Sequence, residues 1–85
     1  MIDNPYIEVT QEDIDKARHA SWPRSTMCPI ARAMQRALHQ PGIGVGIGGI
    51  VFTPNGEYFL PGIAEEFVRE FDRRNEVQPF SFVWV

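Results

Sequence analysis

Residues 43–60 read IGVGIGGIVFTPNGEYFL, a pattern typical of β-strands joined by turns. In residues 43–48 apolar side chains alternate with glycines, which predicts a strand with side chains on one face and almost nothing on the other. The apolar run 50–53 is separated from residues 57–60 by Pro54-Asn55-Gly56, a strong turn signal. The stretch therefore predicts a β-hairpin that is preceded by a glycine-rich strand.

The glycine-rich segment allows more than one interpretation. Gly48-Gly49 is compatible with a tight turn or with a β-bulge, and the bare face of the strand predicts that another group packs closely on it. The run from Gly44 to Gly49 also satisfies the dinucleotide-binding pattern G-x-G-x-x-G, whose glycines open a helix. Here the glycines lead into another strand, so close packing is the better interpretation.

The residues after the hairpin predict an amphipathic helix that begins near Pro61. Its apolar side chains recur at helical spacing on one face: Ile63, Ala64, Phe67, Val68 and Phe71. The pairs Glu65–Arg69 and Glu70–Arg74 lie four residues apart, which favours a solvated outer face.

The N-terminal half of the chain predicts one strand and two helices. Residues 6–9 form a short strand pattern, and Thr10 followed by acidic residues is typical of a capped helix start. Cys28-Pro29 predicts a second helix start with proline in the first turn. Pro41-Gly42 predicts where that helix ends.

The C-terminal residues 77–85 alternate aromatic and smaller side chains, as a strand does. Pro79 limits the start of this strand to an edge position or to the entry of the strand. The resulting order is strand, two helices, three strands, helix, strand. It predicts an α+β fold in a single domain spanning residues 1–85, with a mainly antiparallel sheet of about four to five strands and two to three helices packed on one face.

Composition places the chain among globular proteins, with 85 residues of which 44% are hydrophobic and 22% charged. No apolar run approaches the ~18 residues that span a bilayer, and the N-terminus lacks the features of a signal peptide. We therefore expect a cytoplasmic protein that does not bind membranes. The net charge of -3 argues against tight, nonspecific binding to nucleic acid.

Residues with catalytic or metal-binding potential are few. Cys28 at a helix start resembles a nucleophile, but nothing in the sequence places either His19 or His39 beside it. The two histidines are also too far apart in sequence for a typical metal pair. We therefore predict no catalytic residue, no metal site and no cofactor, and hence a protein that is not an enzyme.

Two groups of residues are candidates for binding a partner. The first surrounds the predicted loop at Trp22 and adds arginines, whose planar guanidinium groups suit carboxylate or phosphate recognition. The second lies on the C-terminal strand, which holds more apolar surface than one face of a small sheet usually hides. The predicted contact residues are Trp22, Arg24, Arg32, Arg36, Phe82, Trp84 and Val85.

Each group also has a purely structural interpretation. The basic residues can be the solvated side of two helices. The C-terminal strand, if central, is buried on both faces. If it lies at an edge, its free backbone groups invite strand addition or a homodimer.

Five blocks of the sequence resemble a group of small, uncharacterised proteins encoded by tailed bacteriophages and prophages. The blocks are VTQEDI at 9–14, CPIA at 28–31, LP at 60–61, FVREFD at 67–72 and VQPFSF at 77–82. The resemblance implies a shared fold and carries over no catalytic residue. The Trp22 loop and the glycine-rich strand depart from the usual pattern of the group.

Small phage accessory proteins commonly occupy a surface on a host protein, including polymerases and CRISPR effectors. The resemblance therefore implies a non-enzymatic accessory protein that binds and modulates, most simply inhibits, a host or host-defence protein, in the manner of an anti-CRISPR. One alternative is a nucleic-acid-binding accessory protein that uses Arg24, Arg32 and Arg36. The other is a self-associating component of the virion or of its assembly.

Overall fold

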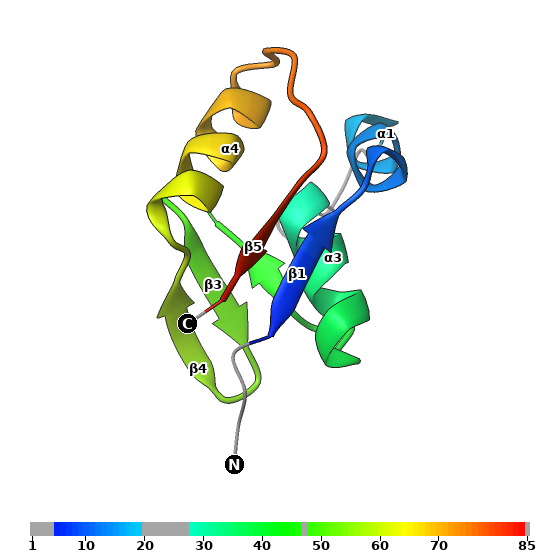
Figure 1. Ribbon diagram of the computed structural model, residues 1–85. Helices are drawn as coiled ribbons and strands as arrows, with labels where there is room; N and C mark the ends of the chain where they lie inside the picture. Colours follow the sequence, from blue (N-terminus) through cyan, green and yellow to red (C-terminus); the bar gives the residue numbers. More distant parts are fainter. Residues whose placement is uncertain (1–4, 20–27, 47, 85) are drawn as a thin grey trace.

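The computed structural model describes residues 5–19, 28–46 and 48–84, and it confirms the α+β class (Figure 1). Along the chain the elements are β1 (Tyr6–Val9), α1 (Gln11–His19), α3 (Pro29–Leu38), β2 (Gly44–Val45), β3 (Ile50–Thr53), β4 (Gly56–Phe59), α4 (Gly62–Asp72) and β5 (Phe80–Val83). No helix in these ranges is long and apolar enough to cross a membrane.

The described strands form two antiparallel sheets, whereas one sheet was expected. β1 pairs with β5, and a second sheet has the order β2-β3-β4. The first pairing aligns Ile7 with Phe82 and Val9 with Phe80, so the apolar faces of both strands turn toward the core together. The second sheet is built from strands consecutive in sequence. The C-terminal strand therefore pairs with the N-terminal strand and leaves β4 at a sheet edge.

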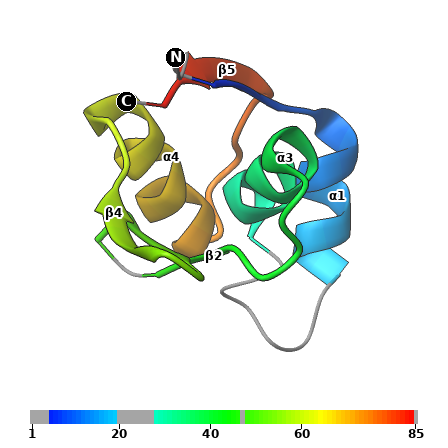
Figure 2. The ribbon, with the colours of Figure 1, turned by 90° about the horizontal axis from the view of Figure 1, so that it is seen from below.

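Helix α3 lies between the two sheets and packs against both β1 and β2. Figure 2 shows α3 and α4 side by side beneath the β1–β5 pair, and α3 also contacts β2 of the second sheet. The α3 side chains Ile30, Ala31 and Met34 are fully buried. They make this helix the centre of the core.

Aromatic side chains join α4 to the C-terminal strand. The ring of Phe67 on α4 stacks on Phe80 of β5 with 4.8 Å between centroids, and Phe80 stacks on Phe82 at 5.6 Å. Such offset contacts add to the stabilisation that burial of the rings provides. This aromatic row fixes the position of α4 against the β1–β5 sheet.

The helix ends agree with most sequence signals. Cys28 is the N-cap of α3 and Pro29 its first residue, as predicted. The helix ends at His39, which adopts a left-handed conformation with φ 55°, before the predicted stop at Pro41-Gly42. Arg74 adopts φ 64° beyond the end of α4.

The predicted ion pairs of α4 are partly corrected. Arg69 lies 3.8 Å from Glu65, as expected. Glu70 pairs with Arg73 at 3.9 Å in place of Arg74, because the left-handed backbone of Arg74 carries that side chain off the helical spacing.

Gly48-Gly49 forms a turn. The N–H of Gly49 donates to the carbonyl of Gly46 at 3.2 Å, and both Gly48 and Gly49 have positive φ, at 83° and 80°. The bare glycine face is closely covered, since a Cβ on Gly46 would lie 2.8 Å from the Phe52 ring. A Cβ on Gly49 would lie 3.1 Å from Cγ of Glu65, so α4 crosses directly over this turn.

We predict that Gly49→Ala lowers the free energy of unfolding by about 2 kcal/mol, because alanine is strained at positive φ. Gly62→Ala is the control, since a Cβ there meets nothing within 4 Å. The control should change stability by less than about 0.5 kcal/mol. Urea unfolding followed by circular dichroism measures both. Equal stability of the two variants would contradict the role given to Gly49.

Candidate functional site

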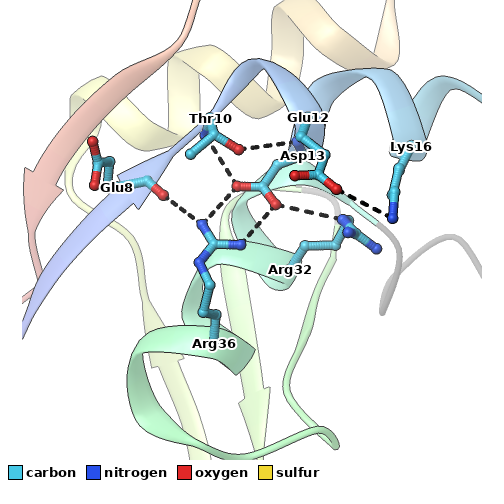
Figure 3. A network of polar contacts seen from close by, with 7 residues as sticks. All are labelled: Glu8, Thr10, Glu12, Asp13, Lys16, Arg32 and Arg36. Atoms are coloured by element: carbon cyan, nitrogen blue, oxygen red, sulfur yellow. Dashed lines mark hydrogen bonds and ion pairs between the residues drawn. The ribbon is translucent and has the colours of Figure 1, made fainter.

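A buried carboxylate lies where β1 meets α1 (Figure 3). Asp13 is only 1% exposed. Its Oδ2 accepts the backbone N–H of Thr10 at 3.0 Å, and its own N–H donates to Oγ1 of Thr10 at 3.2 Å. This reciprocal pair is a capping box with aspartate at the third helical position. The predicted cap at Thr10 is thus confirmed.

Two arginines from α3 approach the same carboxylate. Arg36 donates from Nη1 to Oδ1 of Asp13 at 2.9 Å and from Nη2 to Oδ2 at 2.8 Å. Nη2 also donates to the carbonyl of Glu8 at 2.9 Å. Nε of Arg32 lies 3.5 Å from Oδ1 of Asp13, is buried, and makes no hydrogen bond. Two guanidinium groups therefore share one carboxylate.

The electrostatics of this network favour the ionised pair. Burial alone would raise the pKa of Asp13, but hydrogen bonds from Arg36 and Thr10 together with the charge of Arg36 hold this pKa below its ordinary value. The hydrogen bonds to Asp13 raise the pKa of Arg36 in turn. A buried carboxylate compensated in this way positions its partners firmly.

The structure places two of the predicted contact residues inside this network. Arg32 and Arg36 were expected to face a partner, and both point at Asp13. Arg36 keeps 52% of its side chain exposed and Arg32 keeps 23%. Asp13 was not among the predicted site residues. Its signal was the Thr10-x-x-Asp13 spacing combined with arginines four residues apart on the next helix.

The C-terminal candidates separate into a core residue and a surface residue. Phe82 is 6% exposed and belongs to the core, which corrects the expectation that it contacts a partner. The physical reason is register, because pairing with Ile7 turns Phe82 inward. Trp84 is partly buried at the surface. Trp22, Arg24 and Val85 lie outside the described residues.

Trp84 reaches across from the end of β5 to β4. Its indole Nε1 donates to the carbonyl of Phe59 at 3.2 Å, and its ring meets Tyr58 edge-on with 5.6 Å between centroids. Phe59 is 72% exposed and Tyr58 44% exposed. We call Tyr58, Phe59 and Trp84, together with the free side of β4, the β4 edge.

The backbone of β4 determines which of its polar groups remain accessible. The N–H of Leu60 donates to Gly49 on the β3 side at 2.9 Å. Because backbone groups alternate along a strand, those of Phe59 and Glu57 point away from β3. Side chains alternate as well, so Tyr58 and Phe59 lie on opposite faces of the sheet. The β4 edge therefore offers outward N–H and C=O groups with an aromatic ring on either face.

The β4 edge was not among the predicted contact surfaces. Its signal was the adjacent pair Tyr58-Phe59, because consecutive large apolar residues on one strand cannot both face the core. The sequence alone could not show that β5 would pair with β1 and leave β4 at the edge of its sheet.

The single cysteine is chemically quiet. Cys28 is buried, and burial raises the pKa of its thiol to about 11. The thiolate, which is the nucleophile, is therefore scarce at neutral pH. Within the described ranges, no three His, Cys, Asp or Glu side chains are grouped so that they could hold a metal ion.

No family model, curated protein or solved structure matches this chain. The resemblance to the phage protein group accordingly remains a prediction.

We predict that Arg36→Ala lowers the free energy of unfolding by about 2 kcal/mol or more, because it leaves the Asp13 carboxylate buried with poorer compensation. Arg69→Ala is the matched control, since Arg69 is 51% exposed against 52% for Arg36 and also forms an ion pair. It should cost less than about 0.5 kcal/mol. Chemical unfolding measures the free energy of unfolding of both variants. Similar losses of stability in the two would show that the Asp13–Arg36 pair stabilises the fold no more than a surface ion pair does.

The Asp13 network also predicts a pH dependence. Because the pKa of Asp13 is lowered in the folded chain, the unfolded chain binds the proton more readily. The stabilising contribution of Asp13 is present above the ordinary aspartate pKa of about 3.9. This contribution is lost as the pH falls through the pKa of Asp13 in the folded chain. The free energies of unfolding of the wild type and Asp13→Asn, measured in urea, should differ most near neutral pH and converge in acid. A difference that stays constant with pH would refute this assignment.

Proposed function

We propose that this chain is a small, non-enzymatic accessory protein that binds and modulates a partner protein through the β4 edge. The supporting observation is that Phe59 is 72% exposed on an edge strand that pairs only with β3 among the described strands. The other face of this strand carries Tyr58, which Trp84 contacts. Exposed aromatic residues are typical binding hot spots. Free strand edges recruit extended segments of other proteins by backbone pairing.

The occupant we propose is an extended segment of the partner that adds a strand beside β4. Its backbone would pair with the outward groups of Glu57 and with the N–H of Phe59. Its alternating side chains would contact Phe59 on one face and Tyr58 with Trp84 on the other. The Phe59 carbonyl is already capped by Trp84 at 3.2 Å, so the added strand would pair mainly toward Glu57.

The class of partner follows from the resemblance to phage accessory proteins. On that basis the partner is a host or host-defence protein, and binding takes place in the bacterial cytoplasm. Inhibition is the simplest form of modulation for a protein of 85 residues, because occupying a surface requires no catalytic group.

The nucleic-acid alternative is less well supported. Of its candidate arginines, Arg36 is bound bidentately by Asp13, so this helix face offers Arg32 in place of the extended row of cations that a nucleic-acid backbone favours. The self-association alternative uses the terminal strand β5, which among the described strands pairs only with β1. Self-association would appear as a molecular mass in solution that rises with protein concentration.

The first experiment identifies the partner. We would pass the tagged protein through a bacterial lysate, with and without nuclease, and analyse retained proteins by mass spectrometry. One nuclease-resistant protein at near-stoichiometric yield is the expected result. Retention that disappears with nuclease would favour the nucleic-acid alternative and count against protein binding.

Variants then test the β4 edge against the purified partner. We predict that Phe59→Ser weakens binding by about 30-fold, since truncating a hot spot costs about 2 kcal/mol. Tyr6→Ser is the matched control, because Tyr6 is 64% exposed and lies on β1, in the other sheet. Equal effects of the two substitutions, measured by calorimetry, would place binding elsewhere.

A backbone substitution tests strand addition itself. Glu57→Pro removes an N–H that points away from β3, a position where an edge strand tolerates proline. We predict that Glu57→Pro weakens binding by at least tenfold while Glu57→Ala has little effect. Circular dichroism confirms that both variants are folded. If Glu57→Pro is folded and binds normally, the partner contacts side chains only.

A further inference from the structure

A depression of about 450 Å³ lies beside the C-terminal half of α3, apart from the β4 edge. It is lined by Arg32, Gln35, Arg36, His39 and Pro41. No acidic side chain is among these residues. The depression is therefore a basic surface in a protein whose net charge is -3.

Arg32 and Arg36 lie four residues apart on α3, which brings their side chains together along one face of the helix. His39 follows the last residue of α3 in a left-handed conformation, and its side chain lines the same depression. Residues 29–38 contain no acidic side chain. His39 is held at the end of the helix by its backbone, whose N–H donates to the carbonyl of Gln35.

Among the described residues, the ion pairs of Arg32 and Arg36 involve one carboxylate for the two guanidinium groups. Arg32 and Arg36 share the carboxylate of Asp13, which is buried and is not among the residues that line the depression. Glu8 and Glu12 also act electrostatically on Arg36, but Glu12 pairs with Lys16 at 3.3 Å. Arg36 uses its bidentate edge on Asp13, whereas Arg32 contributes only Nε, at 3.5 Å and without a hydrogen bond.

We propose that this depression binds one phosphate-type oxyanion between the guanidinium of Arg32 and the side chain of His39. A guanidinium presents paired N–H donors whose geometry suits phosphate oxygens. Asp13 acts as the positioning residue. It accepts two hydrogen bonds from Arg36 and pairs with Arg32 at 3.5 Å, and it does not line the depression. The phosphate can belong to a small phosphorylated molecule or to a nucleic-acid backbone, which offer the same group.

The test titrates inorganic phosphate into ¹⁵N-labelled protein at constant ionic strength, with chloride as the balancing anion. Saturable shifts of the amide signals at residues 32–42 are the expected result. Arg32→Gln should raise the dissociation constant at least tenfold. His39→Asn should raise it several-fold, since asparagine keeps the left-handed backbone and removes the imidazole. Shifts without saturation, or equal affinity in Arg32→Gln, would overturn the proposal.

Arg69→Gln is the matched control, since Arg69 is a partly exposed, ion-paired arginine on another helix, and it should leave the affinity unchanged. A short single-stranded DNA oligonucleotide provides the second arm. Competition between the oligonucleotide and phosphate at the same amides assigns the site to a nucleic-acid backbone. Phosphate binding without competition assigns it to a small phosphorylated ligand. If Arg69→Gln and Arg32→Gln lose equal affinity for phosphate, the affinity depends on the net charge of the protein and the proposal of a defined site is refuted.

Discussion

The buried carboxylate of Asp13 is the constraint on which much of this fold depends. A charge at 1% exposure requires compensation. Its donors come from the start of α1 and from α3, which lie far apart in sequence. Such a pair adds little net stability compared with apolar packing, but it admits few alternative arrangements. Asp13 thus sets how α3 lies against the junction of β1 and α1.

The position of α3 in turn explains the division into two sheets. This helix packs against both β1 and β2, and a helix held between two strands keeps those strands from joining one sheet. The C-terminal strand then pairs with β1, where Phe80 and Phe82 reach the core. The consequence is that β4 lies at the edge of its sheet, where Nε1 of Trp84 donates to the outward carbonyl of Phe59.

The sequence predicted features that depend on neighbouring residues, and it failed on those that depend on distant ones. The cap at Thr10, the start of α3 at Pro29 and the turn at Pro54-Asn55 follow from local backbone preferences. The Asp13–Arg36 pair spans 23 residues, and the β1–β5 pairing joins the two ends of the chain. Alternation in the C-terminal strand placed Phe82 and Trp84 on one face. Only the partner strand determined that Phe82 is buried while Trp84 turns toward β4.

The two candidate binding surfaces depend on separate parts of the structure. The β4 edge rests on the hairpin, on the glycine turn beneath α4 and on Trp84, whereas the basic depression rests on α3 and its carboxylate. Substitutions at distant sites without shared partners act nearly additively. Arg32 is also replaceable in principle without removing the bidentate Arg36 pair that orients α3. Loss of one binding activity with retention of the other would therefore report on the surface itself and not on the integrity of the fold.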